Sequence, residues 1–260
     1  MGLRAAVRRR LGWVVDEVVL RHRQAQTAEL LAEVDERIRA ATDRIVAEIR
    51  DVEVRDRRDL RAAAERDAVA SSAAFVQREL ADAVSFPHPH RTLEHALALA
   101  PTGGMALEFG VWTGTTLKII AAARPGEVYG FDSFAGLPES WRAGFPTGAF
   151  GGAEPPQVSG AEIVVGLFAE TLPSFLATHP GPVDLLHLDA DLYSSTACVL
   201  EHVGPRLHPG SVVVFDEFLN YPGWERHEAR AWLEYTAARD LAFRYEAYTH
   251  DHEQVVVRIL

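Results

Sequence analysis

The sequence predicts an α/β fold with a doubly wound, mostly parallel seven-stranded sheet, preceded by a helical segment. After Pro89, short apolar runs alternate with helical patterns, which is typical of strand–helix–strand units. Between Ala28 and Val52, by contrast, apolar residues recur every three or four positions and Gly and Pro are absent. The Phe86–Pro89 stretch ends this helical pattern. We therefore expect residues 1–85 to form a helical arm and residues 86–260 to form the sheet domain.

Composition excludes several classes of protein. Hydrophobic residues make up 48% and charged residues 24% of the 260 residues, which are ordinary globular values. The single cysteine, Cys198, excludes an internal disulfide. A net charge of −11 argues against nucleic-acid binding, which needs clustered positive charge. The sequence shows neither a membrane-spanning stretch nor a signal peptide, so we expect a cytoplasmic protein.

The helical arm carries one apolar stripe. A homo-oligomeric coiled-coil stalk or a docking arm would use this stripe, whereas the alternative is a helix that packs on its own sheet domain. The basic cluster Arg8–Arg10 beside the apolar run Leu11–Val15 has the pattern of a membrane-surface helix, although a solvated helix start is the simpler interpretation. We expect a homo-oligomer without membrane contact. The stripe consists of Leu31, Val34, Ile38, Ala41, Ile45, Ile49 and Val52.

The sheet domain is expected to contain seven strands and at least three helices. Ligands in such sheets bind at the carboxyl ends of the strands. The expected strands cover residues 105–109, 128–131, 163–165, 183–188, 211–215, 243–248 and 254–259, and the expected helices cover residues 115–123, 195–203 and 224–238.

A glycine-containing loop, residues 108–114, joins the first strand to the first helix. Gly110 and Gly114 would let the backbone approach a ligand closely. Trp112 stands where the nicotinamide-dinucleotide fingerprint needs its second glycine, which argues against an oxidoreductase of that kind. Glu108 at the strand end would repel phosphate and suit a ligand with an amino group.

Asp132 ends the second strand, 24 residues after Glu108. A carboxylate at this position accepts hydrogen bonds from a ribose diol, although it could instead cap a turn. Together, the two acids and the glycine loop describe a site for an adenosine ligand without phosphates, S-adenosylmethionine.

Four further acids follow the fourth and fifth strands: Asp189 and Asp191, then Asp216 and Glu217. Bare carboxylates at adjacent strand ends would repel one another, and a hard divalent cation such as magnesium would relieve the repulsion. The alternative is that they cap the helices that follow. We interpret His187, inside the fourth strand, as a satisfied core residue.

Residues 139–160 form a long loop rich in Gly and Pro, with aromatic residues at Trp141, Phe145 and Phe150. Such a loop is either a lid over a ligand or an insertion without a role. We favour a lid, because the loop closely follows Asp132.

Several of these motifs resemble the macrocin O-methyltransferase family. They are residues 108–114, the run Asp132–Pro138 with the pattern Asp-Ser-Phe-x-Gly-Leu-Pro, and residues 171–173, 188–193 and 214–217. That family comprises metal-dependent class I methyltransferases with a Rossmann-like fold that act on sugar hydroxyls of natural products. The resemblance covers about residues 86–260, and the position of Glu217 is often Asp in the family.

The resemblance implies roles for individual residues. It implies that magnesium is held by Asp189, Asp216 and Glu217. The residues implied in S-adenosylmethionine binding are Glu108, Gly110, Val111, Gly114, Asp132, Ser133, Phe134 and Asp189.

We therefore expect an S-adenosylmethionine-dependent O-methyltransferase that uses magnesium. Asp191 is the expected catalytic base, with Asp189 as the alternative. The expected acceptor is a hydroxyl of a glycosylated natural product, and a surface glycan or a phenol are alternatives. A non-catalytic coiled-coil scaffold protein with a nucleotide-binding-like domain is the competing class.

Overall fold

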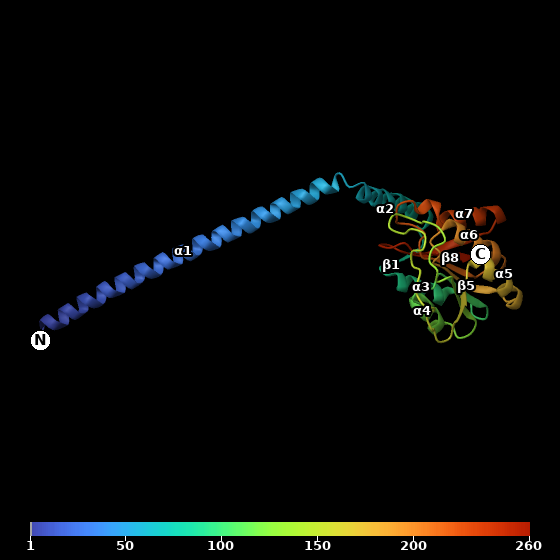
Figure 1. The fold of residues 1–260 in the computed structure, drawn as a ribbon, viewed down its shortest axis with the longest axis horizontal. Helices are drawn as coiled ribbons and strands as arrows, with labels where there is room; N and C mark the ends of the chain where they lie inside the picture. Colours follow the sequence, from blue (N-terminus) through green and yellow to red (C-terminus); the bar gives the residue numbers. More distant parts are fainter. Residues whose placement is uncertain (1) are drawn as a thin grey trace. The chain divides into compact units, whose positions relative to one another are not determined.

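The computed structural model describes residues 2–260, although no side chain is described for residues 2–12 and 14–16. The basic cluster and most of the apolar run near the N-terminus lie among these side chains. Contacts divide the chain into two compact units, Met1–Ala63 and Ala64–Leu260 (Figure 1).

The first unit is built around α1 (Gly2–Asp56), one continuous helix of 55 residues. Its polar surface carries ion pairs between residues four apart, including Arg37–Glu33 at 2.6 Å. The apolar stripe is exposed, with Ile38 at 58% and Ile49 at 60% of their full accessible area. No helix in the described part of the chain combines the length and apolar character needed to span a bilayer.

The helix α2 (Leu60–Glu79) begins where Asp59 accepts hydrogen bonds from the backbone N–H groups of Arg61 and Ala62, as a helix N-cap does. Most of α2 belongs to the second unit. Phe75 is buried and packs edge-on against Trp224, with ring centroids 5.2 Å apart, and the indole N–H of Trp224 donates to Ser71 Oγ at 2.9 Å.

The second unit therefore begins at Ala64, within α2, whereas the sequence suggested a boundary after Ser85. The difference arises because Phe75 joins the core of the sheet-bearing unit, a contact across the chain that helical periodicity alone does not show.

The second unit contains one mixed sheet of eight strands in the order β1-β7-β8-β6-β5-β2-β3-β4. All neighbouring strands are parallel except β8, which runs antiparallel to β6 and to β7. The strands are β1 (Val84–Phe86), β2 (Met105–Phe109), β3 (Val128–Asp132), β4 (Glu162–Val165), β5 (Val183–Leu188), β6 (Val212–Phe215), β7 (Phe243–Thr249) and β8 (Val255–Ile259).

The doubly wound, mostly parallel α/β fold is confirmed, with one strand more than the seven expected. The additional strand is β1, which is only three residues long and directly precedes Pro87, so it carries no readable alternation. Its partner is β7, which it meets in parallel at the edge of the sheet.

Helices cover both faces of the sheet (Figure 1). One hydrophobic core lies between the sheet and α5 (Phe168–Thr178), α6 (Tyr193–Val203) and α7 (Glu228–Arg239). The other lies beneath α3 (Pro89–Leu99) and α4 (Thr115–Ala123). Two 3-10 turns, Gly204–Arg206 and Trp224–Arg226, complete the helical elements, and α3 and α5 are helices that the sequence analysis did not assign.

Side chains alternate between the two faces along each central strand. In β2, Leu107 and Phe109 join the core under α5–α7, whereas Ala106 joins the core under α3 and α4. By the same alternation, Glu108 of β2 and His187 of β5 lie on the face that α3 and α4 cover. The strand register pairs these two residues directly.

Replacing Phe75 by Ala should lower the free energy of unfolding of the second unit by about 3–5 kcal/mol, because a buried aromatic ring is lost and a cavity remains. Val69→Ala, on the same helix but 53% exposed, should change it by less than about 0.5 kcal/mol. Urea unfolding followed by tryptophan fluorescence measures both. Equal, small effects would show that α2 is not part of this core.

Candidate active site

A cavity of about 510 Å³ opens at the carboxyl ends of the central strands, a volume typical of small-molecule sites. The loops after β2, β3, β5 and β6 all contribute to its wall. Its polar and glycine lining includes Gly110, Asp132, Ser133, Arg142, Asp189, Asp191, Asp216 and Glu217.

The loop after β2 is tightly packed at Gly110. This residue has φ +95°, and a Cβ there would lie 1.8 Å from the carbonyl oxygen of Asp189. Glycine is therefore required by the close approach of the loops after β2 and β5. Trp112 also has a positive φ, +45°, and contributes to the cavity wall.

Asp132 connects this loop to the end of β3. Its Oδ2 accepts hydrogen bonds from the backbone N–H groups of Val111 and Trp112, both at 2.8 Å, and its Oδ1 accepts from Phe134 N–H at 2.8 Å. The carboxylate therefore fixes both loops and also faces the cavity. The two interpretations of Asp132 from sequence, turn cap and ligand-facing acid, are compatible in this geometry.

Glu108 is fully buried and does not contribute to the cavity wall. Its Oε1 lies 2.9 Å from His187 Nδ1, and His187 Nε2 lies 3.6 Å from Asp216 Oδ1. Burial alone would lower the pKa of His187, but the interactions with Asp216 and Glu108 raise it well above its usual value. A buried imidazolium between two carboxylates thus joins β2, β5 and the end of β6.

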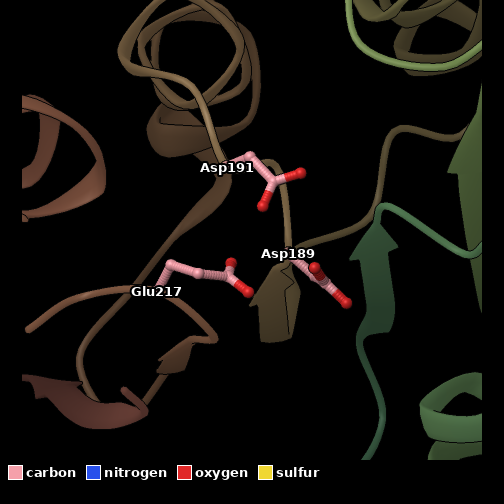
Figure 2. Close-up of side chains that lie close together, drawn as sticks. All are labelled: Asp189, Asp191 and Glu217. Carbon is pink, nitrogen blue, oxygen red and sulfur yellow. The ribbon is translucent and has the colours of Figure 1, made fainter. Parts of the chain in front are cut away.

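Three acids meet at the cavity (Figure 2). Asp189 and Asp191 from the loop after β5, and Glu217 from the loop after β6, each place a carboxylate oxygen within 4.8 Å of the others. Asp216 also lines the cavity, but its Oδ2 accepts a hydrogen bond from Gln254 Nε2 at 3.1 Å. The cluster therefore contains Asp189 and Glu217 of the expected metal set together with Asp191, the expected base, while Asp216 is engaged by its neighbours.

The electrostatics of this cluster fit a cation. Burial, with the nearby Asp216 carboxylate, raises the pKa values of Asp189 and Glu217 well above their usual range. Burial raises the pKa of Asp191 to about 7, although Arg142 opposes this shift. Glu217 Oε2 is buried and has no hydrogen-bond partner. An oxygen-only donor set of this kind suits a hard divalent ion such as Mg²⁺.

Glu228 is a buried acid that the sequence analysis did not single out. It occupies the first position of α7, where an acidic residue is common, so its sequence context carries no special signal. Its two carboxyl oxygens accept hydrogen bonds from Ala190 N–H and Glu217 N–H, each at 3.2 Å. Burial raises its pKa to about 8.

The loop between β3 and β4 forms an aromatic wall of the cavity. Trp141, Phe145 and Phe150 all line it, and the guanidinium of Arg142 lies 4.0 Å above the Trp141 ring. Arg142 also forms an ion pair with Glu253 at 2.9 Å. These contacts hold the loop along one side of the cavity.

Comparison with known proteins shows which proteins the second unit is similar to. Residues 107–218 match the model of a methyltransferase domain. One curated relative is 8-demethyl-8-(2,3-dimethoxy-alpha-L-rhamnosyl)-tetracenomycin-C 4'-O-methyltransferase from Streptomyces olivaceus, 42% identical over 53 residues. That match covers 20% of this chain and only 19% of the relative's length.

Two solved structures are also similar. The calicheamicin methyltransferase CalS11 shares 26% sequence identity, with a TM-score of 0.52 over 65% of this chain and 76% of that one. The O-methyltransferase NovP shares 24% identity, with a TM-score of 0.49 over 64% of this chain and 78% of that one.

The second unit thus has the class I, Rossmann-like fold of known methyltransferases, and residues 107–218 within it are similar to a methyltransferase domain. The resemblance to O-methyltransferases of sugar-bearing natural products, expected from the motifs, is confirmed. The matched residues 107–218 include every cavity acid named above, whereas α1 lies outside the match.

Replacing His187 by Leu should lower the free energy of unfolding by about 3–5 kcal/mol, because Glu108 and Asp216 would lose the cation between them. His252→Leu, at an exposed position, serves as the control and should have an effect below about 0.5 kcal/mol. Chemical unfolding of both variants measures the difference. A loss for His187→Leu no larger than the control's would contradict the role of His187 as a buried counter-ion.

Proposed function

We propose that this protein transfers the methyl group of S-adenosylmethionine to a hydroxyl oxygen of a sugar moiety on a natural product, with Mg²⁺ as metal cofactor. The observation that carries the proposal is that the Asp132-anchored loop and the oxygen-only acid cluster face the same cavity. The names of the curated relative and of CalS11, a methyltransferase of the calicheamicin system, support this class of reaction.

We assign cofactor binding to the residues that line the cavity on the β2–β3 side. Asp132 would accept the ribose hydroxyls, with Gly110, Ser133 and Asp189 forming the adjacent wall. The other candidate cofactor-binding residues do not line the cavity and would instead support the loop that does. Val111 and Phe134 donate their N–H groups to Asp132, Gly114 precedes α4, and Glu108 lies below with His187.

The metal would be held by Asp189 and Glu217, with Asp191 or Asp216 as the third protein ligand. A bound divalent ion would supply Lewis-acid activation of the acceptor hydroxyl. Methyl transfer forms a carbon–oxygen bond, breaks the carbon–sulfur bond and neutralises the sulfonium, and the hydroxyl proton must leave. Asp191, whose carboxylate lies in the acid cluster, would accept that proton, and Asp189 is the alternative.

The wall of Trp141, Phe145 and Phe150 offers apolar surface for the body of the acceptor. A glycoside with an apolar aglycone would place its sugar hydroxyl near the acids and its aglycone against these rings. A surface glycan or a phenol could bind in the same cavity but would contact less of this aromatic wall. We place the reaction in the cytoplasm.

We also propose that α1 pairs with α1 of a second copy. Its stripe of seven apolar positions is regular, with six of them exposed and Ala41 half-buried, and every copy of the chain presents the same stripe. Pairing two copies along this stripe would bury apolar area on both helices, and a specific interface buries at least about 1,200 Å² in total. The heptad-like spacing favours a coiled coil.

Replacing Asp132 by Ala should weaken binding of S-adenosylhomocysteine by about tenfold or more, because the variant loses charge-assisted hydrogen bonds to the loop and to the ribose. Isothermal titration of the wild type and the variant measures this. Glu162→Ala, on the exposed edge strand β4, should bind as the wild type does. Binding of NAD in place of the methionine-derived ligands would contradict the proposed function.

Titration of Mg²⁺ tests the acid cluster. The wild type should bind Mg²⁺, and Asp189→Asn and Glu217→Gln should each weaken that affinity by about tenfold or more, because each removes a charged oxygen ligand. Asp240→Asn, at the C-terminal end of α7, is the control. S-adenosylhomocysteine affinity should stay within a few-fold for the Glu217→Gln variant. Unchanged Mg²⁺ affinity in both cluster variants would remove the metal from the proposal.

Light scattering on the full chain tests the pairing of α1. The wild type should have the mass of at least two chains, and the double substitution Ile38→Glu and Ile45→Glu should shift it to one chain, because it places charges on the apolar stripe. Asp43→Lys changes charge on the same helix away from the stripe and should leave the mass unchanged. A single-chain mass for the wild type would contradict pairing.

A further inference from the structure

The buried carboxyl group of Glu228 bridges the two loops that carry the acid cluster. We propose that Glu228 is a positioning residue for the metal site, setting the distance between the loop after β5 and the loop after β6. The inference rests on the proposed function, because it concerns the same site, but it assigns a role to a residue that would not itself bind the metal.

The geometry is direct. Glu228 Oε1 accepts from the N–H of Ala190, which lies between Asp189 and Asp191, and its Oε2 accepts from the N–H of Glu217. Both distances are 3.2 Å. Each hydrogen bond therefore holds the backbone at, or directly beside, the residues whose carboxylates form the cluster.

Two further elements meet at the same group. Thr196 Oγ1 of α6 lies 3.5 Å from Glu228 Oε1, and Glu228 itself begins α7. The side chain is fully buried, so water does not compete for these contacts. One carboxyl group therefore connects the ends of two strands to the starts of the two helices that pack against each other.

The chemistry of the link requires a carboxyl group. Both backbone partners are donors, so both side-chain atoms that face them must be acceptors. An amide offers only one acceptor and would direct its NH₂ group at an N–H donor. A buried acid beside other acids is costly, and an uncharged residue such as Ala or Pro would occupy the first position of a helix without that cost. Starting α7 is therefore an insufficient explanation for Glu228.

The expected consequence is specific to the metal. Mg²⁺ requires oxygen ligands at about 2.0–2.1 Å in nearly ideal geometry, so a small shift between the two loops should weaken its binding. The cofactor side of the cavity depends instead on Asp132 and the loops after β2 and β3. Loss of the hydrogen bonds from Glu228 should therefore lower the affinity for Mg²⁺ and leave the affinity for the cofactor nearly unchanged.

The test is titration of Glu228→Gln with Mg²⁺ and, separately, with S-adenosylhomocysteine. We expect Mg²⁺ affinity to fall by about 10–100-fold, as is typical when groups that orient metal ligands are removed. We expect S-adenosylhomocysteine affinity to stay within a few-fold. The matched control is Glu234→Gln on the same helix, where the glutamate is exposed and pairs with Arg230.

A second variant, Glu228→Asp, keeps the acid but is one methylene shorter, so it cannot reach both amides. It should lose Mg²⁺ affinity as Glu228→Gln does, whereas a role through charge alone would leave its affinity intact. Wild-type Mg²⁺ affinity in either folded variant would overturn the inference. Absence of Mg²⁺ binding by the wild type would instead overturn the proposed metal site, so the two failures are distinguishable.

Discussion

Crowding of carboxylates at the carboxyl ends of β5 and β6 is the constraint on which the rest of the site depends. Asp189, Asp191 and Glu217 lie within ligand distance of one another, and Asp216 stands beside them. Their mutual repulsion in a buried setting is offset by groups from other parts of the chain. His187 lies against Asp216, and the Arg142 guanidinium opposes the rise that burial causes in the pKa of Asp191. A divalent cation would offset most of what remains.

The fold brings this cluster to the cofactor side of the cavity because parallel strands end at the same edge of a sheet. Strands β2 and β3 end in the loop anchored by Asp132, and β5, directly beside β2, ends in the acids. Gly110 permits the two loops to touch, since any side chain there would collide with the carbonyl of Asp189. A methyl donor and a metal-activated acceptor would therefore meet within one cavity.

Much of this arrangement could be predicted from the sequence, because the signals are local. Apolar runs that end at Asp132, Asp189 and Asp216 predict the central strands, and the acids predict a binding site at the carboxyl ends of those strands. The missing parts depend on contacts between distant segments. The strand register that pairs Glu108 with His187, and the reach of Glu228 from α7 to two loops, leave no trace in spacing. Phe75 likewise joins the second unit through packing, which moves its start to Ala64.

The proposed divalent metal site is formed by carboxylates at the ends of β5 and β6 and opens to the same cavity as Asp132. An anomalous difference map from crystals of the full chain grown with Mn²⁺ and S-adenosylhomocysteine tests it most directly, since Mn²⁺ accepts the same oxygen ligands. We expect a peak bound by Asp189 and Glu217, with the nucleoside beside Asp132. Density for the nucleoside without a metal peak at these carboxylates would contradict it.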